Sequence, residues 1–166
     1  SYEIFKIFRK NKRIILFLIE EKIITIDKFI TNALLNEKYN INNYYEYFSP
    51  EILPFIKDLK VKTENDQDLP DNFYEKRRIG ENDNYICHLI RNDLIEEFII
   101  FVNKNDYPLD EFIEPSIYET NLFLNKKSKN NQFLYNYQKD HPTTLIEYAA
   151  FYGSIQIFKY LFKNNI

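Results

Sequence analysis

The stretch TTLIEYAAFYGSIQIFKYLF, residues 143–162, differs from the rest of the chain because small residues occur in it. Ala149 and Ala150 stand side by side, and Gly153 is one of only two glycines. Glycine adopts a positive φ angle at little cost and commonly ends helices. We therefore expect a helix over LIEYAAFY, a tight turn at Gly153 and a second helix over SIQIFKYLF. The alanines would let the two helices approach closely, although alanine is also simply a good helix former.

Signals for helix starts recur along the chain. Thr144 and Glu147 have capping-box spacing, in which the hydroxyl accepts a first-turn N–H and the glutamate accepts the N–H of the cap residue. Such a cap stabilises a helix by about 1 kcal/mol. Three further starts are predicted: Ser116 with Glu119, Asp93 with Glu96 as a looser analogue, and SPEILPFI, where Ser49 is the N-cap, Pro50 the first helical residue and Glu51 part of the first turn.

Composition and periodicity both predict an all-α fold. Two glycines in 166 residues is far below the usual share of about 7%, and hairpin-rich β folds depend on glycine turns. Apolar residues recur at helical spacing in FIIFVNK and IFKYLFK. We expect three to five short helices in an N-terminal region, residues 1–60, one of them near residues 26–35. We expect a linker or surface loop at residues 61–72. Residues 73–166 are expected to form helical repeats, which start with a short helix that ends at Gly80.

An internal repeat emerges when the chain is compared with itself at an offset of 60 residues. Residues 84–105 then align with residues 144–165 without a gap, and apolar positions coincide along two consecutive helices and their turn. An offset near 60 corresponds to two units of a 30-odd-residue repeat. A degenerate unit that starts at Ser116 is therefore expected between them. Chance agreement is the alternative, because the chain is rich in Ile and Phe.

The segment TLIEYAAFYGSIQIFKYLFKNN resembles an ankyrin repeat, whose pattern is T-P-L-H-x-A-A-x-x-G-H-x-x-I-V-x-x-L-L-x-x-G. The chain departs from that pattern at Leu145, Glu147, Ser154 and Asn165. The resemblance implies an ankyrin-like solenoid of stacked helical hairpins. The residues expected to maintain the repeat are Thr144, Glu147, Ala149, Ala150, Gly153, Ile157 and Leu161.

A wider resemblance covers most of residues 40–166. The segments YFSPEI, LPDNFYEKRRIGEND, YICHLIRNDLIEEFI and EPSIYETNLFL look like the N-terminal helical region of a large protist family of ankyrin-repeat proteins, a domain of unknown function. This resemblance implies a divergent N-terminal helical cap, a longer parent protein and no enzymatic activity. The start at Ser1 without a methionine also suggests a fragment. An exposed apolar end is then expected at Phe158, Leu161 and Phe162.

The same resemblance indicates where a partner would bind. In ankyrin repeats, the variable positions between Ala-Ala and Gly face the concave surface, and here they are Phe151 and Tyr152. Exposed aromatic residues are common anchors of interfaces, although these two could instead pack on a neighbouring hairpin. His141 and Thr143 are expected at the hairpin tip, where Pro142 replaces the usual glycine.

We predict no catalytic, cofactor-binding or metal-binding residue. Two glycines cannot provide a G-x-G-x-x-G fingerprint or a phosphate loop. Cys87, His88 and His141 are too few to form a structural zinc site. Cys87 and His88 are adjacent, so on a helix they point about 100° apart and cannot form a nucleophile–base pair. Cys87 is expected to be a small buried hydrophobe, although a dyad with His141 would be possible if the fold brought the two together.

Charge and hydropathy restrict the environment. A net charge of −3 does not favour nucleic acid. The longest apolar run, residues 14–19, is shorter than the roughly 20 residues that span a bilayer. A single cysteine excludes an internal disulfide and favours an intracellular, cytoplasmic setting. Three basic clusters are expected to be solvated or ion-paired: Arg9, Lys10, Lys12 and Arg13; Lys76, Arg77 and Arg78; and Lys126, Lys127 and Lys129.

The sequence therefore predicts a non-catalytic protein–protein interaction module that docks an unidentified protein by shape complementarity. The alternative is a regulatory domain that binds RNA or an anionic surface through the basic clusters. Steep salt dependence of binding would favour the alternative. Binding that is insensitive to salt and requires Phe151 and Tyr152 would favour the interaction module.

Overall fold

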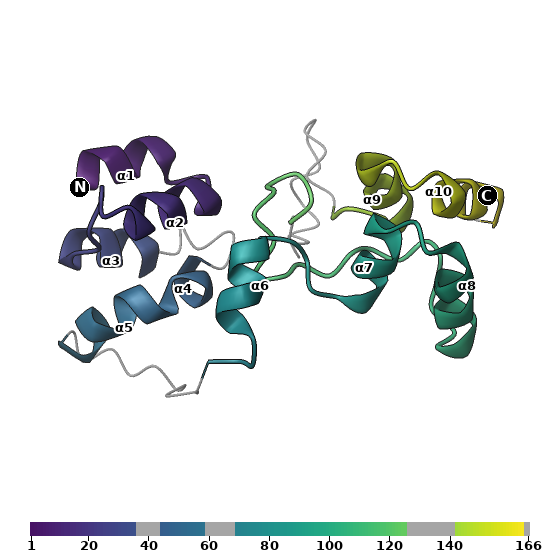
Figure 1. Ribbon diagram of the computed structural model, residues 1–166, viewed down its shortest axis with the longest axis horizontal. Coiled ribbons are helices and arrows are strands. Elements are labelled where there is room, and N and C mark those ends of the chain that lie inside the picture. Colours follow the sequence, from purple (N-terminus) through teal and green to yellow (C-terminus); the bar gives the residue numbers. More distant parts are fainter. Residues whose placement is uncertain (36–43, 59–68, 126–141, 165–166) are drawn as a thin grey trace, which may run out of the picture. The chain divides into compact units, whose positions relative to one another are not determined.

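The computed structural model describes residues 1–35, 44–58, 69–125 and 142–164. Within these ranges every regular element is an α-helix, from α1 to α10 (Figure 1). The one strand-like pairing among them is an isolated antiparallel bridge between Phe112 and Thr144. The chain divides into a first unit, Ser1–Glu81, and a second unit, Asn82–Ile166. The all-α prediction is confirmed.

The first unit contains six helices in its described ranges. They are α1 (Tyr2–Phe8), α2 (Lys12–Glu20), α3 (Lys28–Leu35), α4 (Tyr44–Tyr47), α5 (Ser49–Asp58) and α6 (Phe73–Ile79). The helix expected near residues 26–35 is α3. Ser49 is the first residue of α5 rather than its cap, and the helix continues through Pro54.

One apolar core holds α1 to α5 together. Its members are the buried side chains Phe5, Ile15, Leu16, Leu18, Ile24, Ile26, Ile30, Leu34, Tyr44, Tyr47, Phe48, Ile52 and Ile56. Aromatic rings pack edge to face inside it, with the centroids of Tyr47 and Phe48 4.9 Å apart. Each short helix has one apolar face, so the helices are stable only when they share this core.

Helix α6 packs with the first unit, which ends at Glu81, whereas the sequence predicted that the helical repeats begin at residue 73. Arg77 of α6 explains why. Its guanidinium donates to both carboxylate oxygens of Glu51, at 2.8 and 2.9 Å, and to the carbonyl oxygen of Tyr47 at 3.2 Å. The side chain is only 6% exposed and lies 5.4 Å from the ring centroid of Phe73. Of the predicted linker, only residues 69–72 lie within the described ranges.

The described residues of the second unit form two helical hairpins. The first hairpin is α7 (Tyr85–Arg91) and α8 (Ile95–Lys104), and the second is α9 (Leu145–Tyr152) and α10 (Ile155–Asn164). Helix α9 packs against α7, and α10 packs against α8 (Figure 1). The starts of α7 and α9 are 60 residues apart, at 85 and 145, and so are those of α8 and α10, at 95 and 155. The predicted repeat at this offset is confirmed as helix geometry.

Local signals at the second hairpin act as predicted. The hydroxyl of Thr144 accepts the N–H of Glu147 at 3.3 Å, and the carboxylate of Glu147 accepts the N–H of Thr144 at 3.0 Å. Gly153 ends α9 with φ 70°, and Gly80 ends α6 with φ 74°. Left-handed angles of this kind cost residues with a side chain about 1–2 kcal/mol, which explains the two glycines.

The helix start predicted at Ser116 is wrong, because described residues 106–125 contain no helix, and the rest of the predicted degenerate unit, through residue 141, lies outside the described residues. The Ser116 hydroxyl donates to the carboxylate of Asp83 at 2.7 Å. The buried carboxylate of Glu119 accepts the backbone N–H groups of Asn82 and Asn121, at 3.2 and 2.8 Å. These residues hold an irregular segment against the start of α7, so they are not available to cap a local helix.

We predict that Arg77→Lys lowers the unfolding free energy of the first unit by about 2 kcal/mol, because lysine keeps the charge but loses the two-pronged bond to Glu51. Urea unfolding combined with hydrogen exchange of α4 to α6 would measure this. The adjacent exposed residue provides the control, and Arg78→Lys should stay within about 0.5 kcal/mol of the parent. Equal losses in the two variants would contradict the structural role of Arg77.

Candidate functional site

The two hairpins of the second unit are joined by hydrogen bonds between their tight turns. Asp93 follows α7 with a positive φ of 51°. Its carboxylate accepts the backbone N–H groups of Gln156 and Ile157, at 3.1 and 3.0 Å, in the first turn of α10. In return, the Ser154 hydroxyl donates to the carbonyl oxygen of Ile90. A carboxylate at a helix N-terminus is favoured by the helix dipole, so Asp93 fixes where α10 begins on the first hairpin.

The predicted Asp93–Glu96 cap is therefore wrong. Leu94 precedes α8, with no hydrogen bond from its side chain to the helix, and Glu96 is exposed. The carboxylate of Asp93 instead caps a helix about 60 residues further along the chain. Asp93 and Glu96 have the spacing of the motif, but the Asp93 carboxylate accepts N–H groups of α10 in the neighbouring hairpin rather than of α8.

A second polar link joins α7 to α9. The Arg91 guanidinium donates to the hydroxyl of Tyr148 at 2.9 Å and to the carbonyl oxygen of Asn82 at 2.8 Å. Tyr148 is fully buried, and burial raises the pKa of its hydroxyl. The hydroxyl consequently stays protonated at neutral pH and accepts from arginine. The bond to Tyr148 fastens α9 of the second hairpin to α7 of the first.

The four predicted partner-binding residues differ in their surroundings. Phe151 is 52% exposed on α9. Tyr152 is half-buried, with its ring 4.9 Å from that of Tyr148 and 6.0 Å from the guanidinium carbon of Arg91, so it packs on the neighbouring hairpin. His141 lies outside the described residues.

Thr143 requires a correction. It was expected at the hairpin tip as a partner-binding residue, but it is only 6% exposed. The Thr143 hydroxyl donates to the carbonyl oxygen of Phe123 at 3.0 Å, and its own carbonyl oxygen accepts the N–H of Ile113 at 2.7 Å. Thr143 thus fastens the irregular segment to the start of α9 and does not present its side chain to a partner.

The second hairpin has large apolar side chains on its surface. Phe151, Ile155 and Phe162 are each more than half exposed. Leu161, which was expected to be exposed, is fully buried. Of the two alanines, Ala149 is buried and Ala150 is exposed, so close helix contact explains only the first. We take the exposed part of this hairpin as the candidate site.

Cys87 lies inside the second unit, and His141, its possible dyad partner, lies outside the described residues. Cys87 is fully buried, and burial raises the pKa of its thiol to about 12. At neutral pH the thiol is therefore protonated and weakly nucleophilic. His88 on the same helix is exposed and its ring stacks on that of Tyr85, with centroids 6.4 Å apart. The prediction of a buried, hydrophobe-like Cys87 is confirmed.

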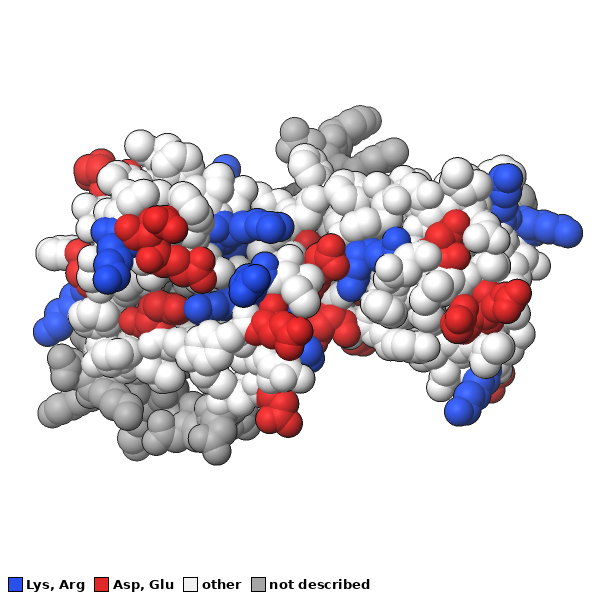
Figure 2. Space-filling view, in the orientation of Figure 1, with Lys and Arg blue, Asp and Glu red and all other residues white. Residues whose placement is uncertain are grey.

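The basic clusters are partly used inside the first unit. Arg77 is paired with Glu51, and Lys12 is only 1% exposed, with its ammonium 5.0 Å from the ring centroid of Tyr47. The third cluster lies outside the described residues. Figure 2 shows basic and acidic side chains interspersed on the visible face rather than one basic area.

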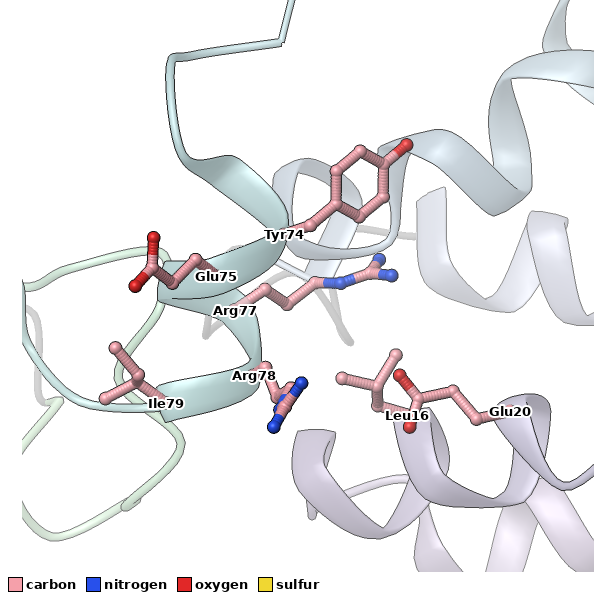
Figure 3. Close-up of a pocket in the computed structure, with 7 residues that line it drawn as sticks. All are labelled: Leu16, Glu20, Tyr74, Glu75, Arg77, Arg78 and Ile79. Carbon is pink, nitrogen blue, oxygen red and sulfur yellow. The ribbon is translucent and has the colours of Figure 1, made fainter.

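A depression of about 630 Å³ lies between α2 and α6 of the first unit (Figure 3). Its lining comprises Leu16, Glu20, Tyr74, Glu75, Arg77, Arg78 and Ile79. The side chain of Arg78 extends from α6 toward Leu16 and Glu20. Charges of both signs line it, and Ser, Cys and His are absent from its described lining.

Searches for two further kinds of site gave no candidate in the described ranges. No cluster of three or more His, Cys, Asp or Glu residues is placed to hold a metal ion. Among the helices that the structure describes, none has the length and hydropathy needed to cross a membrane.

Comparison of the chain with protein-family models, with curated proteins and with solved structures finds no match. The ankyrin resemblance therefore stays a prediction. The candidate site depends on the geometry of the second hairpin.

Sequence reasoning missed the roles of Asp93 and Arg91. One signal was present, because the repeat offset places Asp93 opposite Gly153. A residue equivalent to a helix-ending glycine is expected to have a positive φ, and aspartate tolerates one better than most residues. No local pattern indicates that Arg91 would reach Tyr148, because these residues are 57 positions apart.

We predict that Asp93→Ala destabilises the second unit by about 1–2 kcal/mol, because two first-turn amides of α10 lose their acceptor. Hydrogen exchange of peptides from α10 would report the loss. Asp93→Asn, which tolerates the left-handed φ, should lose less. Asp110→Ala removes an exposed carboxylate of the same unit as a control, and its exchange should match the parent. Unchanged protection of α10 in Asp93→Ala would contradict the cap.

Alkaline pH should destabilise the chain through Cys87. Burial raises the folded-state pKa of the thiol from 9.0 to about 12, so the folded state binds this proton more tightly than the unfolded state. The stabilisation is complete below pH 9 and is lost as pH rises toward 12. We expect Cys87 to contribute a loss on the order of 2 kcal/mol between pH 8 and pH 10.5. Urea unfolding at both pH values should show a smaller loss in Cys87→Ala, and an identical loss would contradict the burial.

Proposed function

We propose that the chain is a non-catalytic protein–protein interaction module of ankyrin-like, stacked helical hairpins. The observation that supports this proposal is the apolar surface of the second hairpin, where Phe151, Ile155 and Phe162 are each more than half exposed. Exposed aromatic side chains are common anchors of protein interfaces. A protein partner would cover them.

Rigidity of the second hairpin supports this proposal. The capping box of Thr144 and Glu147, the turn at Gly153 and the cap from Asp93 hold both helices in place before any partner arrives. A surface that is already ordered loses little conformational entropy on binding. Phe151 then offers an aromatic ring, whose centroid lies 5.2 Å from that of Tyr152, as an anchor.

The repeat geometry also supports the proposal. Two hairpins with the same 60-residue offset in both helices lie side by side, and the resemblance of residues 144–165 to an ankyrin repeat suggests the same construction. In this function, binding would come from shape and apolar contact. The buried thiol of Cys87 and the paired guanidinium of Arg77 would have structural roles.

The proposal is tested with the full chain as bait for a native lysate, followed by titration of the purified captured protein. Phe151→Ala should weaken its binding about tenfold or more, as expected for an aromatic hot spot. The matched control is Ile100→Ala, because Ile100 is 64% exposed on α8 of the other hairpin. Circular dichroism would establish that both variants are folded.

Three outcomes count against the proposal. One is the absence of any protein that binds saturably. Another is an equal loss of affinity in Phe151→Ala and Ile100→Ala, which would place the contact elsewhere. The third is capture of nucleic acid that is released by moderate salt, which would favour binding through the basic clusters.

A further inference from the structure

A basic segment surrounds the turn between α1 and α2 of the first unit. Residues 4–19 contain five basic and no acidic side chains, although the chain as a whole has a net charge of −3. Lys12 is buried and Arg9 is half-buried, but Lys10 and Arg13 are exposed. The exposed cations therefore flank the turn itself, where α1 and α2 lie side by side (Figure 1).

Large apolar side chains are exposed close to these cations. Ile7 is 74% exposed near the end of α1, and Phe17 and Ile14 of α2 are 55% and 37% exposed. None of the three belongs to the described core of the first unit or packs against it. The surface around the turn is thus both positively charged and apolar.

Helical spacing places each exposed cation beside an apolar side chain. Lys10 follows Ile7 by three residues, and the C-cap of α1 between them keeps helical angles, with φ −53° and ψ −19°. On α2, Phe17 follows Arg13 by four residues and Ile14 by three. Residues three or four apart share one side of a helix. We call Ile7, Lys10, Arg13, Ile14 and Phe17 the basic tip.

Hydrogen bonds fix the turn that carries the basic tip. The side chain of Asn11 accepts the N–H of Ile14 at 3.0 Å, which caps α2, and the N–H of Asn11 donates to the carbonyl oxygen of Phe8 at 2.8 Å. Both helices also pack into the apolar core, through Phe5 of α1 and Ile15 of α2. These contacts set the position of the tip, which reduces the ordering that binding would require.

The combination of cations and aliphatic side chains indicates an anionic lipid surface as the ligand. Protein segments that bind at the membrane–water interface keep Lys and Arg near the headgroups and bury apolar side chains at the acyl boundary. Anionic headgroups attract each nearby cation. Single-stranded nucleic acid instead stacks its bases on aromatic rings, and the basic tip has one ring and two isoleucines.

We propose that the basic tip binds the surface of an anionic lipid membrane. Its cations contact the headgroups, and its apolar side chains enter the acyl boundary. The acidic residues of the two helices do not oppose this, because Glu3 is paired with Lys6 at 2.8 Å and Glu20 is at the end of α2 opposite to the tip. This inference goes beyond the proposed function. It concerns the first unit, so either of the two can fail alone.

The test is flotation of the full chain with lipid vesicles. One set of vesicles contains equal parts of phosphatidylcholine and phosphatidylserine, and the other contains phosphatidylcholine alone. We expect saturable binding to the anionic vesicles only. Lys10→Gln combined with Arg13→Gln should weaken this binding about tenfold or more, because each cation near the surface contributes a factor of about five. Ile7→Ser keeps the charge and should still weaken binding several-fold, because less apolar area is buried.

The second unit provides matched controls. Lys104→Gln combined with Ile100→Ser changes an exposed cation and an isoleucine that is 64% exposed on α8, and binding should match that of the parent. The chain has no tryptophan, so Phe17→Trp and Phe162→Trp each introduce one reporter, at sites that are 55% and 59% exposed. Anionic vesicles with brominated acyl chains should quench the first reporter and not the second. Circular dichroism would establish that all variants are folded.

Four results would overturn the inference. One is equal binding to both sets of vesicles, or binding to neither. Another is unchanged binding of Ile7→Ser, which would leave electrostatic attraction alone. The third is an equal loss in the control variant of the second unit, which would move the contact away from the tip. The fourth is tighter binding to poly-uridine RNA than to vesicles, lost in the Lys10→Gln and Arg13→Gln variant, which would make nucleic acid the ligand.

Discussion

The hydrogen bonds that the Asp93 carboxylate accepts from α10 join the two hairpins, and the packing of the second unit depends on them. The carboxylate places two acceptor oxygens at the start of α10, while Ser154 returns a bond to the carbonyl of Ile90. A helix N-terminus has N–H groups with no partner inside the helix. By supplying those partners from the preceding hairpin, the chain joins two short hairpins that could not bury their apolar faces alone. This arrangement fixes the position of the second hairpin, on which Phe151, Ile155 and Phe162 are exposed.

Short-range signals predicted much of that hairpin. Gly153 ends α9 and the Thr144–Glu147 box starts it, because both depend on residues within one helical turn. The repeat at an offset of 60 residues predicted the relation of α7 to α9 and of α8 to α10 for a similar reason. The spacing of apolar residues indicates which side of a helix is buried, whichever element covers that side.

Predictions failed where a group far away in the sequence bonds to the residues of a predicted local motif. Ser116 and Glu119 have the same spacing as Thr144 and Glu147, yet they bond Asp83 and Asn82 and no helix forms. Arg77 appeared to belong to a solvated basic cluster, but Glu51 binds it, and α6 joins the first unit as a result. The candidate site shows the same limit, since a contact with Phe123 removes Thr143 from it while Phe151 stays exposed.

The distance along the chain between Asp93 and α10 also has a consequence for folding kinetics. Each hairpin closes over a few residues, but the bonds from Asp93 to Gln156 and Ile157 span 63 and 64 residues. Helices and tight turns form within about microseconds, whereas contacts of long sequence separation slow folding. We therefore expect the hairpins to dock more slowly than either hairpin forms. The entropy of closing so long a loop grows only with the logarithm of its length, so doubling the intervening segment would cost roughly 0.6 kcal/mol.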